Sequence, residues 1–101
     1  SVTSDIRSKQ HIELFDVNNA VDIVNKLGMY EYRYREGDQR QKIGVIAQEV
    51  EEHFPRAVTQ GSQYKQVDFT QIISLQNGRI VLRRFLHAAA SHRRRTARRG
   101  R

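Results

Sequence analysis

The sequence contains no cysteine, and this absence removes two kinds of structure. Without thiols the chain forms neither a disulfide nor a thiolate-ligated zinc site, and its redox compartment stays undecided. The histidines share no tight ligand spacing, so we expect no metal site and no cofactor. They are His11, His53, His87 and His92.

Long apolar runs are absent as well. No run approaches the ~18 residues of a membrane span, and the first residues lack a basic-then-apolar signal pattern. We therefore expect a soluble chain that does not contact a membrane. Apolar residues make up 38% of the 101 residues, against about 45–50% in an average domain. One small domain with so thin a core often completes it by oligomerising or by docking on a covalent neighbour.

Acidic residues are missing from the end of the chain, and the net charge of +7 is therefore unevenly distributed. Residues 1–78 hold nine Lys and Arg and all eleven acids, a net charge of −2. Residues 79–101 hold the other nine basic residues and no acid, a net charge of +9. A basic tail of this kind binds phosphates without reading sequence, or is simply a solvated end. Nucleic acid is therefore an alternative partner, and not the one we expect.

The apolar pattern predicts an α+β domain of short helices and β-hairpins with a C-terminal helical extension. A first helix is expected over residues 20–27, capped by Asn18 or Asn19. Tyrosines that alternate with charged residues predict a strand over 30–35, and 42–47 reads as the returning strand of a hairpin.

A second helix is expected over 47–54, because Pro55 cannot continue it. Short strands follow on both sides of a turn at 61–62, and Asp68 or Thr70 caps a last helix. That helix is expected to break at Asn77–Gly78 and to resume, which casts doubt on a long coiled coil. From residue 91 onward nothing can pack, and we expect disorder.

A serine and a lysine near the start, Ser4 and Lys9, raise the possibility of a reactive pair. A serine hydroxyl needs a base beside it to act as a nucleophile, and a lysine amine can be that base when it is neutral. Five residues turn an ideal helix by about 500°, which leaves the two side chains about 140° apart around the helix. In a strand an odd offset puts them on opposite faces. Spacing alone therefore favours a solvated terminus, and a dyad requires a bend or a lysine from another chain. Ser8 is the rival nucleophile, although neighbouring side chains point apart.

Two further groups are polar candidates with simpler explanations. Tyr30, Tyr32 and Tyr34 beside arginines could stack RNA bases, although a strand that faces a core explains them as well. Gln48 and Glu49 lie beside an apolar run on the second predicted helix, where a solvated surface is the ordinary reading.

Three stretches in order carry a resemblance: SDIRSK (4–9), IGVIAQEVEEHFP (43–55) and VDF (67–69). Together they resemble the peptidase S74 family, the C-terminal intramolecular chaperone domain of phage tail spikes, tail fibres and neck appendages. The resemblance covers about residues 4–75. It implies a homotrimer that aligns three upstream chains, helps them to fold, and then cuts itself off with a serine–lysine dyad.

On the matching positions the resemblance implies that Ser4 is the nucleophile and Lys9 its general base, with Asp5 directly after the serine. The scissile bond is then expected at Thr3–Ser4, because Ser4 Oγ reaches the preceding carbonyl through a five-membered ring. Glu49 or Gln48 is expected to orient the lysine or to contact the cleavage segment, either in its own chain or across a subunit boundary.

The resemblance also implies boundaries and a place of action. Residues 1–3 are expected to be a remnant of the upstream spike, 4–75 the chaperone domain, 76–90 an interrupted helix and 91–101 a basic tail. The domain is expected to act in the host cytoplasm during virion assembly and to be released from the mature virion or absent from it. A non-cleaving trimerisation module of the same fold remains open, as does a nucleic-acid-binding domain that uses the basic tail.

Overall fold

The computed structural model describes residues 2–99 and has the predicted α+β character. Its helical elements are the 3₁₀ turns η1 (Ile6–Ser8) and η2 (Pro55–Ala57) and the α-helices α1 (Val17–Lys26), α2 (Ala47–His53) and α3 (Phe69–Arg99). Its strands are β1 (Tyr30–Tyr32), β2 (Lys42–Gly44), β3 (Val58–Gln60) and β4 (Lys65–Val67).

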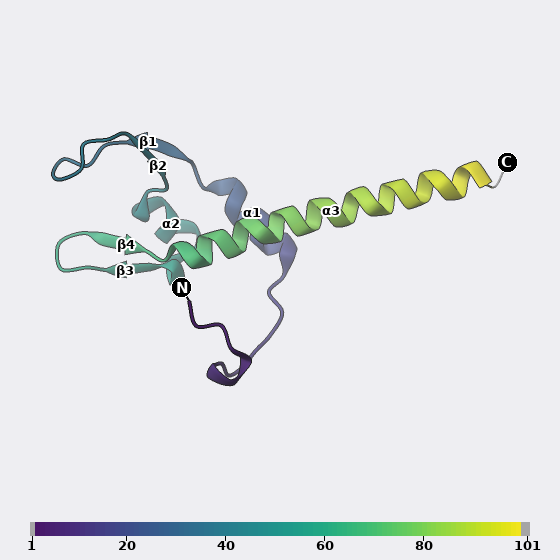
Figure 1. Cartoon of the computed structure of the whole chain (residues 1–101), viewed down its shortest axis with the longest axis horizontal. Coiled ribbons are helices and arrows are strands. Elements are labelled where there is room, and N and C mark those ends of the chain that lie inside the picture. Colours follow the sequence, from purple (N-terminus) through teal and green to yellow (C-terminus); the bar gives the residue numbers. More distant parts are fainter. Residues whose placement is uncertain (1, 100–101) are drawn as a thin grey trace.

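The strands form two separate antiparallel hairpins, β1–β2 and β3–β4. Tyr30 pairs with Gly44 in the first, and Val58 pairs with Val67 in the second. The tips of both hairpins point away from the body on the same side, opposite to the free end of α3 (Figure 1).

Helix α1 begins earlier than its asparagines indicate. Asp16 is the N-cap, because its carboxylate accepts a hydrogen bond from the Asn18 amide at 2.9 Å. Asn18 and Asn19 lie inside the first turn, so the prediction that one of them caps the helix is wrong. A carboxylate at the N-cap also complements the helix dipole, which favours the earlier start.

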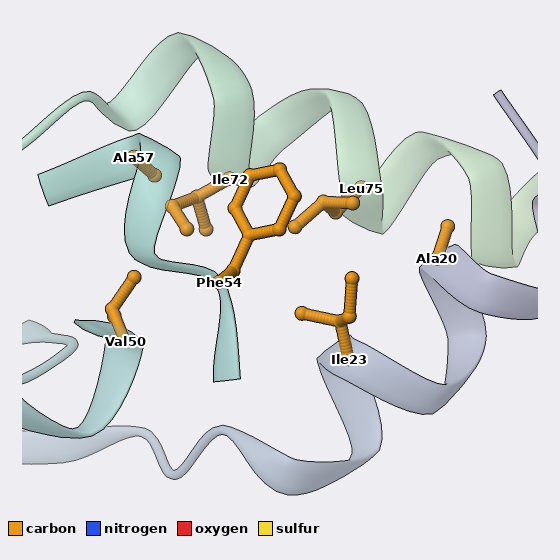
Figure 2. Close-up of a cluster of buried hydrophobic side chains, with 7 residues drawn as sticks. All are labelled: Ala20, Ile23, Val50, Phe54, Ala57, Ile72 and Leu75. Atoms are coloured by element: carbon orange, nitrogen blue, oxygen red, sulfur yellow. The ribbon is translucent and has the colours of Figure 1, made fainter. Parts of the chain in front are cut away.

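The core is small and joins elements that are far apart in the sequence. Among the residues whose burial the structure describes, seven side chains are buried, and they come from α1, α2, the residue after α2, η2 and the start of α3 (Figure 2). They are Ala20, Ile23, Val50, Phe54, Ala57, Ile72 and Leu75. The second hairpin contributes the half-buried Val58 and Val67 to its edge, and Val45, directly after β2, does the same.

Helix α3 continues without a break through Asn77 and Gly78, so the predicted interruption is wrong. A glycine inside a helix costs only about 1 kcal/mol relative to alanine. Gly78 also allows α1 to pack closely, since a Cβ at this position would lie 3.2 Å from the Ala20 Cβ. The helix extends to Arg99, which overturns the expected disorder for 91–99, because alanine and arginine are strong helix formers. Residues 100–101 lie outside the described residues.

The chain is far from compact. Its radius of gyration is 18.9 Å and its extents are 66 × 37 × 26 Å, whereas a compact chain of this length has a radius near ~13 Å. Two parts cause the difference: α3 projects from the body in one direction, and the N-terminal arm, defined as residues 2–16, loops away on another side (Figure 1). Every residue of the arm is exposed.

Candidate functional site

The N-terminal arm reverses its direction through the turn η1. Asp5 is the N-cap of this turn, and its Oδ1 accepts the Arg7 amide at 2.8 Å. The Asp5 carbonyl accepts the Ser8 amide at 3.0 Å, and the Ile6 carbonyl accepts the Lys9 amide at 3.2 Å. The backbone before and after the turn is extended, so Ser4 and Lys9 leave it in positions from which their side chains can meet.

The turn brings the serine and the lysine together within one chain. Lys9 Nζ donates a hydrogen bond to Ser4 Oγ at 3.0 Å. Neither an ideal helix nor a strand allows this contact at a spacing of five, and the 3₁₀ turn supplies the bend that the spacing requires. A serine hydroxyl beside an amine is the arrangement that a lysine general base needs.

The neighbouring serine has a different function in the structure. Ser8 Oγ donates to the Asp5 carbonyl at 2.7 Å, so its hydroxyl helps to close the turn. Among the polar contacts of residues 2–99, none joins Ser8 Oγ to Lys9 Nζ. The geometry therefore favours Ser4 over Ser8 as the partner of the lysine.

Asp5 and Arg7 form an ion pair within the same turn. Arg7 Nε lies 3.1 and 3.2 Å from the two Asp5 carboxylate oxygens, and Arg7 Nη2 lies 2.8 Å from Oδ2. The side-chain hydrogen bonds from Arg7, and then its backbone amide, hold the pKa of Asp5 below its ordinary value. The same pair raises the pKa of Arg7. Asp5 therefore stays ionised at neutral pH. The sequence analysis missed the pairing of Asp5 with Arg7, although the spacing Asp-x-Arg could have indicated it.

Glu49 lies on α2 and holds the segment between α1 and β1. Its carboxylate accepts hydrogen bonds from the Gly28 amide and from the Tyr30 hydroxyl. These two bonds, in that order, lower the pKa of Glu49. Gln48, the preceding residue of the same short helix, is exposed. Within residues 2–99 neither side chain hydrogen-bonds to Ser4 or Lys9, so a supporting role for either in cleavage stays a prediction.

The arm joins the body at an aromatic cluster that the sequence did not reveal. The rings of Phe15 and Phe54 meet edge to face, with centroids 6.4 Å apart. The Arg56 guanidinium lies over both rings, 5.4 Å from the Phe15 centroid and 4.9 Å from that of Phe54. Phe15 is 40% exposed, whereas its neighbour Leu14 is fully exposed. Phe15 is therefore the first anchor of the chain after the Ser4–Lys9 turn.

A family model described as peptidase S74, chaperone of endosialidase, matches residues 4–59, which is more than half of the chain. This chain belongs to that family. No curated protein matches the chain. The two terms of the description refer to a peptidase and to a chaperone. The peptidase S74 match begins at Ser4 and includes the turn, α1, the first hairpin and α2.

The family match ends within β3, so β4 and α3 lie beyond it. The stretch 43–55 of the resemblance is inside the match, and 67–69 is not. The proposed domain boundary at residue 75 therefore stays a prediction. The basic residues that raise the possibility of nucleic acid all lie on α3 and beyond it.

The remaining candidates form no second site. Tyr30 is bonded to Glu49, and Tyr32 and Tyr34 pack edge to face with centroids 5.3 Å apart. They line an open groove with Val45 and Phe69 and do not enter the core. Among the residues that the structure describes, no three His, Asp or Glu side chains are grouped as metal ligands would be. No helix in that part of the chain is long and apolar enough to cross a membrane.

Proposed function

We propose that this chain is the intramolecular chaperone of an upstream phage tail spike or neck appendage. It assembles as a homotrimer, guides the folding of the three upstream chains, and releases itself once by cutting next to Ser4. Ser4 is the nucleophile and Lys9 the general base. The hydrogen bond of 3.0 Å between Lys9 Nζ and Ser4 Oγ is the observation that carries this proposal.

The chemistry follows from this contact. The neutral Lys9 amine accepts the Ser4 hydroxyl proton while Oγ attacks the Thr3 carbonyl carbon, which closes a five-membered ring. The Lys9 ammonium then returns a proton to the Ser4 nitrogen as the Thr3–Ser4 amide bond breaks, leaving an ester between Thr3 and Ser4 Oγ. Water hydrolyses this ester to a Thr3 carboxylate and a free Ser4. An intramolecular attack of this kind can remove about 7–11 kcal/mol of the barrier, so a weakly activated serine suffices.

Assembly would prepare the dyad for reaction. Ser4 and Lys9 are exposed in the single chain, and an amine must be neutral to act as a base. Removal of water from around a lysine favours its neutral form. If the neighbouring copies of a trimer cover the arm, cleavage follows assembly and does not precede it. Each chain cuts its own bond once, so no turnover is expected.

The large exposed surface supports an assembly. The chain exposes 9116 Å², whereas a compact protein of this mass exposes about 5,900 Å². The excess of about 3,200 Å² lies in the range that obligate interfaces bury. Large apolar side chains remain exposed on α3 at Ile80, Val81, Phe85 and Leu86, and the uninterrupted helix removes one objection to a helical stalk.

The chaperone role has a physical basis in alignment. Three chains held side by side pair at a high effective concentration, so the interchain β-structure of a spike forms almost intramolecularly. Once the chaperone domain is released, the spike can no longer unfold by the reverse of its folding path. The spike therefore keeps a high barrier to unfolding. This action belongs in the host cytoplasm during assembly, and the released domain would be absent from the virion.

A gel of a precursor tests the cleavage. The precursor is this chain together with the encoded sequence that precedes it, as wild type and with Ser4→Ala, Lys9→Ala or Ser8→Ala. We expect the wild type and Ser8→Ala to be cut and the other two to stay full length. N-terminal sequencing of the product should begin at Ser4. If the wild type stays uncut and light scattering reports a trimer, the cleavage proposal fails, and the chain is a non-cleaving trimerisation module. A single chain in that assay contradicts the chaperone itself.

A further inference from the structure

The reactive turn contains its own competitor for the lysine. Asp5 follows Ser4 directly, and it is the one acidic residue in the stretch from Ser4 to Lys9. A lysine ammonium pairs more readily with a carboxylate than with a hydroxyl. Such a pair would hold the amine in its protonated form and remove it from the serine. In the structure the lysine nevertheless contacts the hydroxyl.

The same chain shows that the competing pair forms readily. The spacing Asp-x-Arg-x-Lys occurs twice, at residues 5–9 and at 38–42. In the second stretch Arg40 hydrogen-bonds to both carboxylate oxygens of Asp38, as Arg7 does to Asp5. Its Nε lies 3.1 Å from both oxygens and its Nη2 lies 2.9 Å from one. There, however, Lys42 Nζ also donates to Asp38 Oδ2 at 3.2 Å. Gly37 precedes that aspartate, so no hydroxyl is available to the lysine.

The arginine contact is the same in both stretches, and Lys42 pairs with Asp38 in spite of it, so this contact alone does not exclude the lysine from the carboxylate. In the first stretch it acts together with the Ser4 hydroxyl, which offers the lysine a second partner. The planar guanidinium donates to both oxygens of Asp5 and compensates its charge. The polar contacts of residues 4–9 in the structure all stay within this stretch. Its charged groups are therefore Asp5, Arg7 and Lys9, with His11 and Glu13 following along the arm. No group on another element is needed to explain the geometry of the turn.

We propose that Arg7 is a positioning residue for self-cleavage: it compensates part of the Asp5 charge, so that the Ser4 hydroxyl competes successfully with this carboxylate for the Lys9 amine. This inference rests on the proposed cleavage, since it names a residue that acts on the dyad through Asp5. Arg7 itself takes no proton and touches no reacting atom.

The proposal predicts a specific change with pH. When Arg7 is replaced by Gln, the uncompensated Asp5 carboxylate favours the protonated amine. The cleavage rate is expected to rise with pH as the amine loses its proton. In the variant this rise should occur at higher pH than in the wild type. At neutral pH we expect cleavage about two- to fivefold slower, which is the shift that an exposed ion pair produces in a two-state equilibrium. At high pH the amine is neutral, the ion pair with Asp5 is lost, and the rates of variant and wild type should converge.

The test measures cleavage of the full precursor against pH for the wild type and four variants. The single variant Arg7→Gln should be slow at low and neutral pH only. The double variant Asp5→Asn with Arg7→Gln should recover, because the amide still caps the turn but no longer attracts the ammonium. The cleavage rate of Arg7→Lys should lie between those of the single and the double variant. A lysine keeps the positive charge but lacks the planar guanidinium that donates to both carboxylate oxygens. Arg40→Gln is the matched control in the second stretch and should leave the profile unchanged.

The outcomes separate the two proposals. If the wild type stays uncut, the proposed function fails and this inference fails with it. If the wild type is cut and Arg7→Gln has the same profile, only the role of Arg7 is overturned. A loss of rate by the same factor at every pH, without recovery in the double variant, would also overturn it. That result would mean that Arg7 only supports the turn.

Discussion

The aromatic anchor of the arm should stabilise the fold measurably, and Phe15→Ala tests this. About 60% of the Phe15 side chain is covered, and full burial of a phenylalanine contributes about 1.5–3 kcal/mol. The edge-to-face contact with Phe54 adds about 0.5–1.5 kcal/mol. These contributions overlap in part. We therefore expect Phe15→Ala to lower the free energy of unfolding by about 1–2.5 kcal/mol.

Urea unfolding followed by circular dichroism measures this loss, and the neighbouring residue provides the control. Leu14 is fully exposed, so Leu14→Ala should change the free energy of unfolding by less than about 0.5 kcal/mol. Equal losses for the two variants, or no loss for Phe15→Ala, would refute the anchor. A Leu14 effect that appears only as the protein concentration rises would instead place Leu14 against another copy.

Three further predictions concern the body of the domain. Gly78→Leu should overpack α1 against α3 at Ala20 and destabilise by about 1–3 kcal/mol in urea unfolding, and an unchanged midpoint would refute the close approach. Val50→Ala, at the most buried side chain, should lower the thermal midpoint through a loss of about 2 kcal/mol. Glu49 has a pKa lowered by the Gly28 amide and a tyrosine hydroxyl, so its stabilisation is present above the unfolded-state pKa and is lost as pH falls. Stability measured from pH 7 to pH 3 should therefore fall less steeply for Glu49→Gln, and an equal slope would contradict this.

The element types of the body followed from local patterns because those patterns have local causes. Polar and apolar positions over 47–53 repeat at helical spacing, and Pro55 prevents continuation, so α2 was predicted with its correct start and with an end one residue too late, at 54 and not at His53. Asp68 accepts the Thr70 amide at 3.1 Å, as expected of a residue that precedes a helix. In each case the deciding atoms are within four residues of one another, and no distant partner is needed.

The predictions failed where two elements meet. A glycine after an asparagine reads as a helix break, but packing of α1 against α3 at Gly78 outweighs the local preference. The aromatic cluster was missed for the same reason, since Phe15 and Phe54 are far apart in sequence. Tertiary contacts of this kind leave no periodic signal.

For the candidate site, the sequence alone determined the residue types, their order and the family. These followed from the motif at 4–9 read together with 43–55 and 67–69, and the family match, which covers the first two stretches, confirms the family. Only the three-dimensional structure decided that Lys9 contacts Ser4 within one chain. The contact needs a 3₁₀ turn, and neither the helical nor the strand periodicity of side chains predicts it. It also decided that Arg7 binds Asp5 and that Ser8 closes the turn. The physical reason is that a motif specifies which groups are present, whereas the backbone hydrogen bonds of the turn specify which of them can touch.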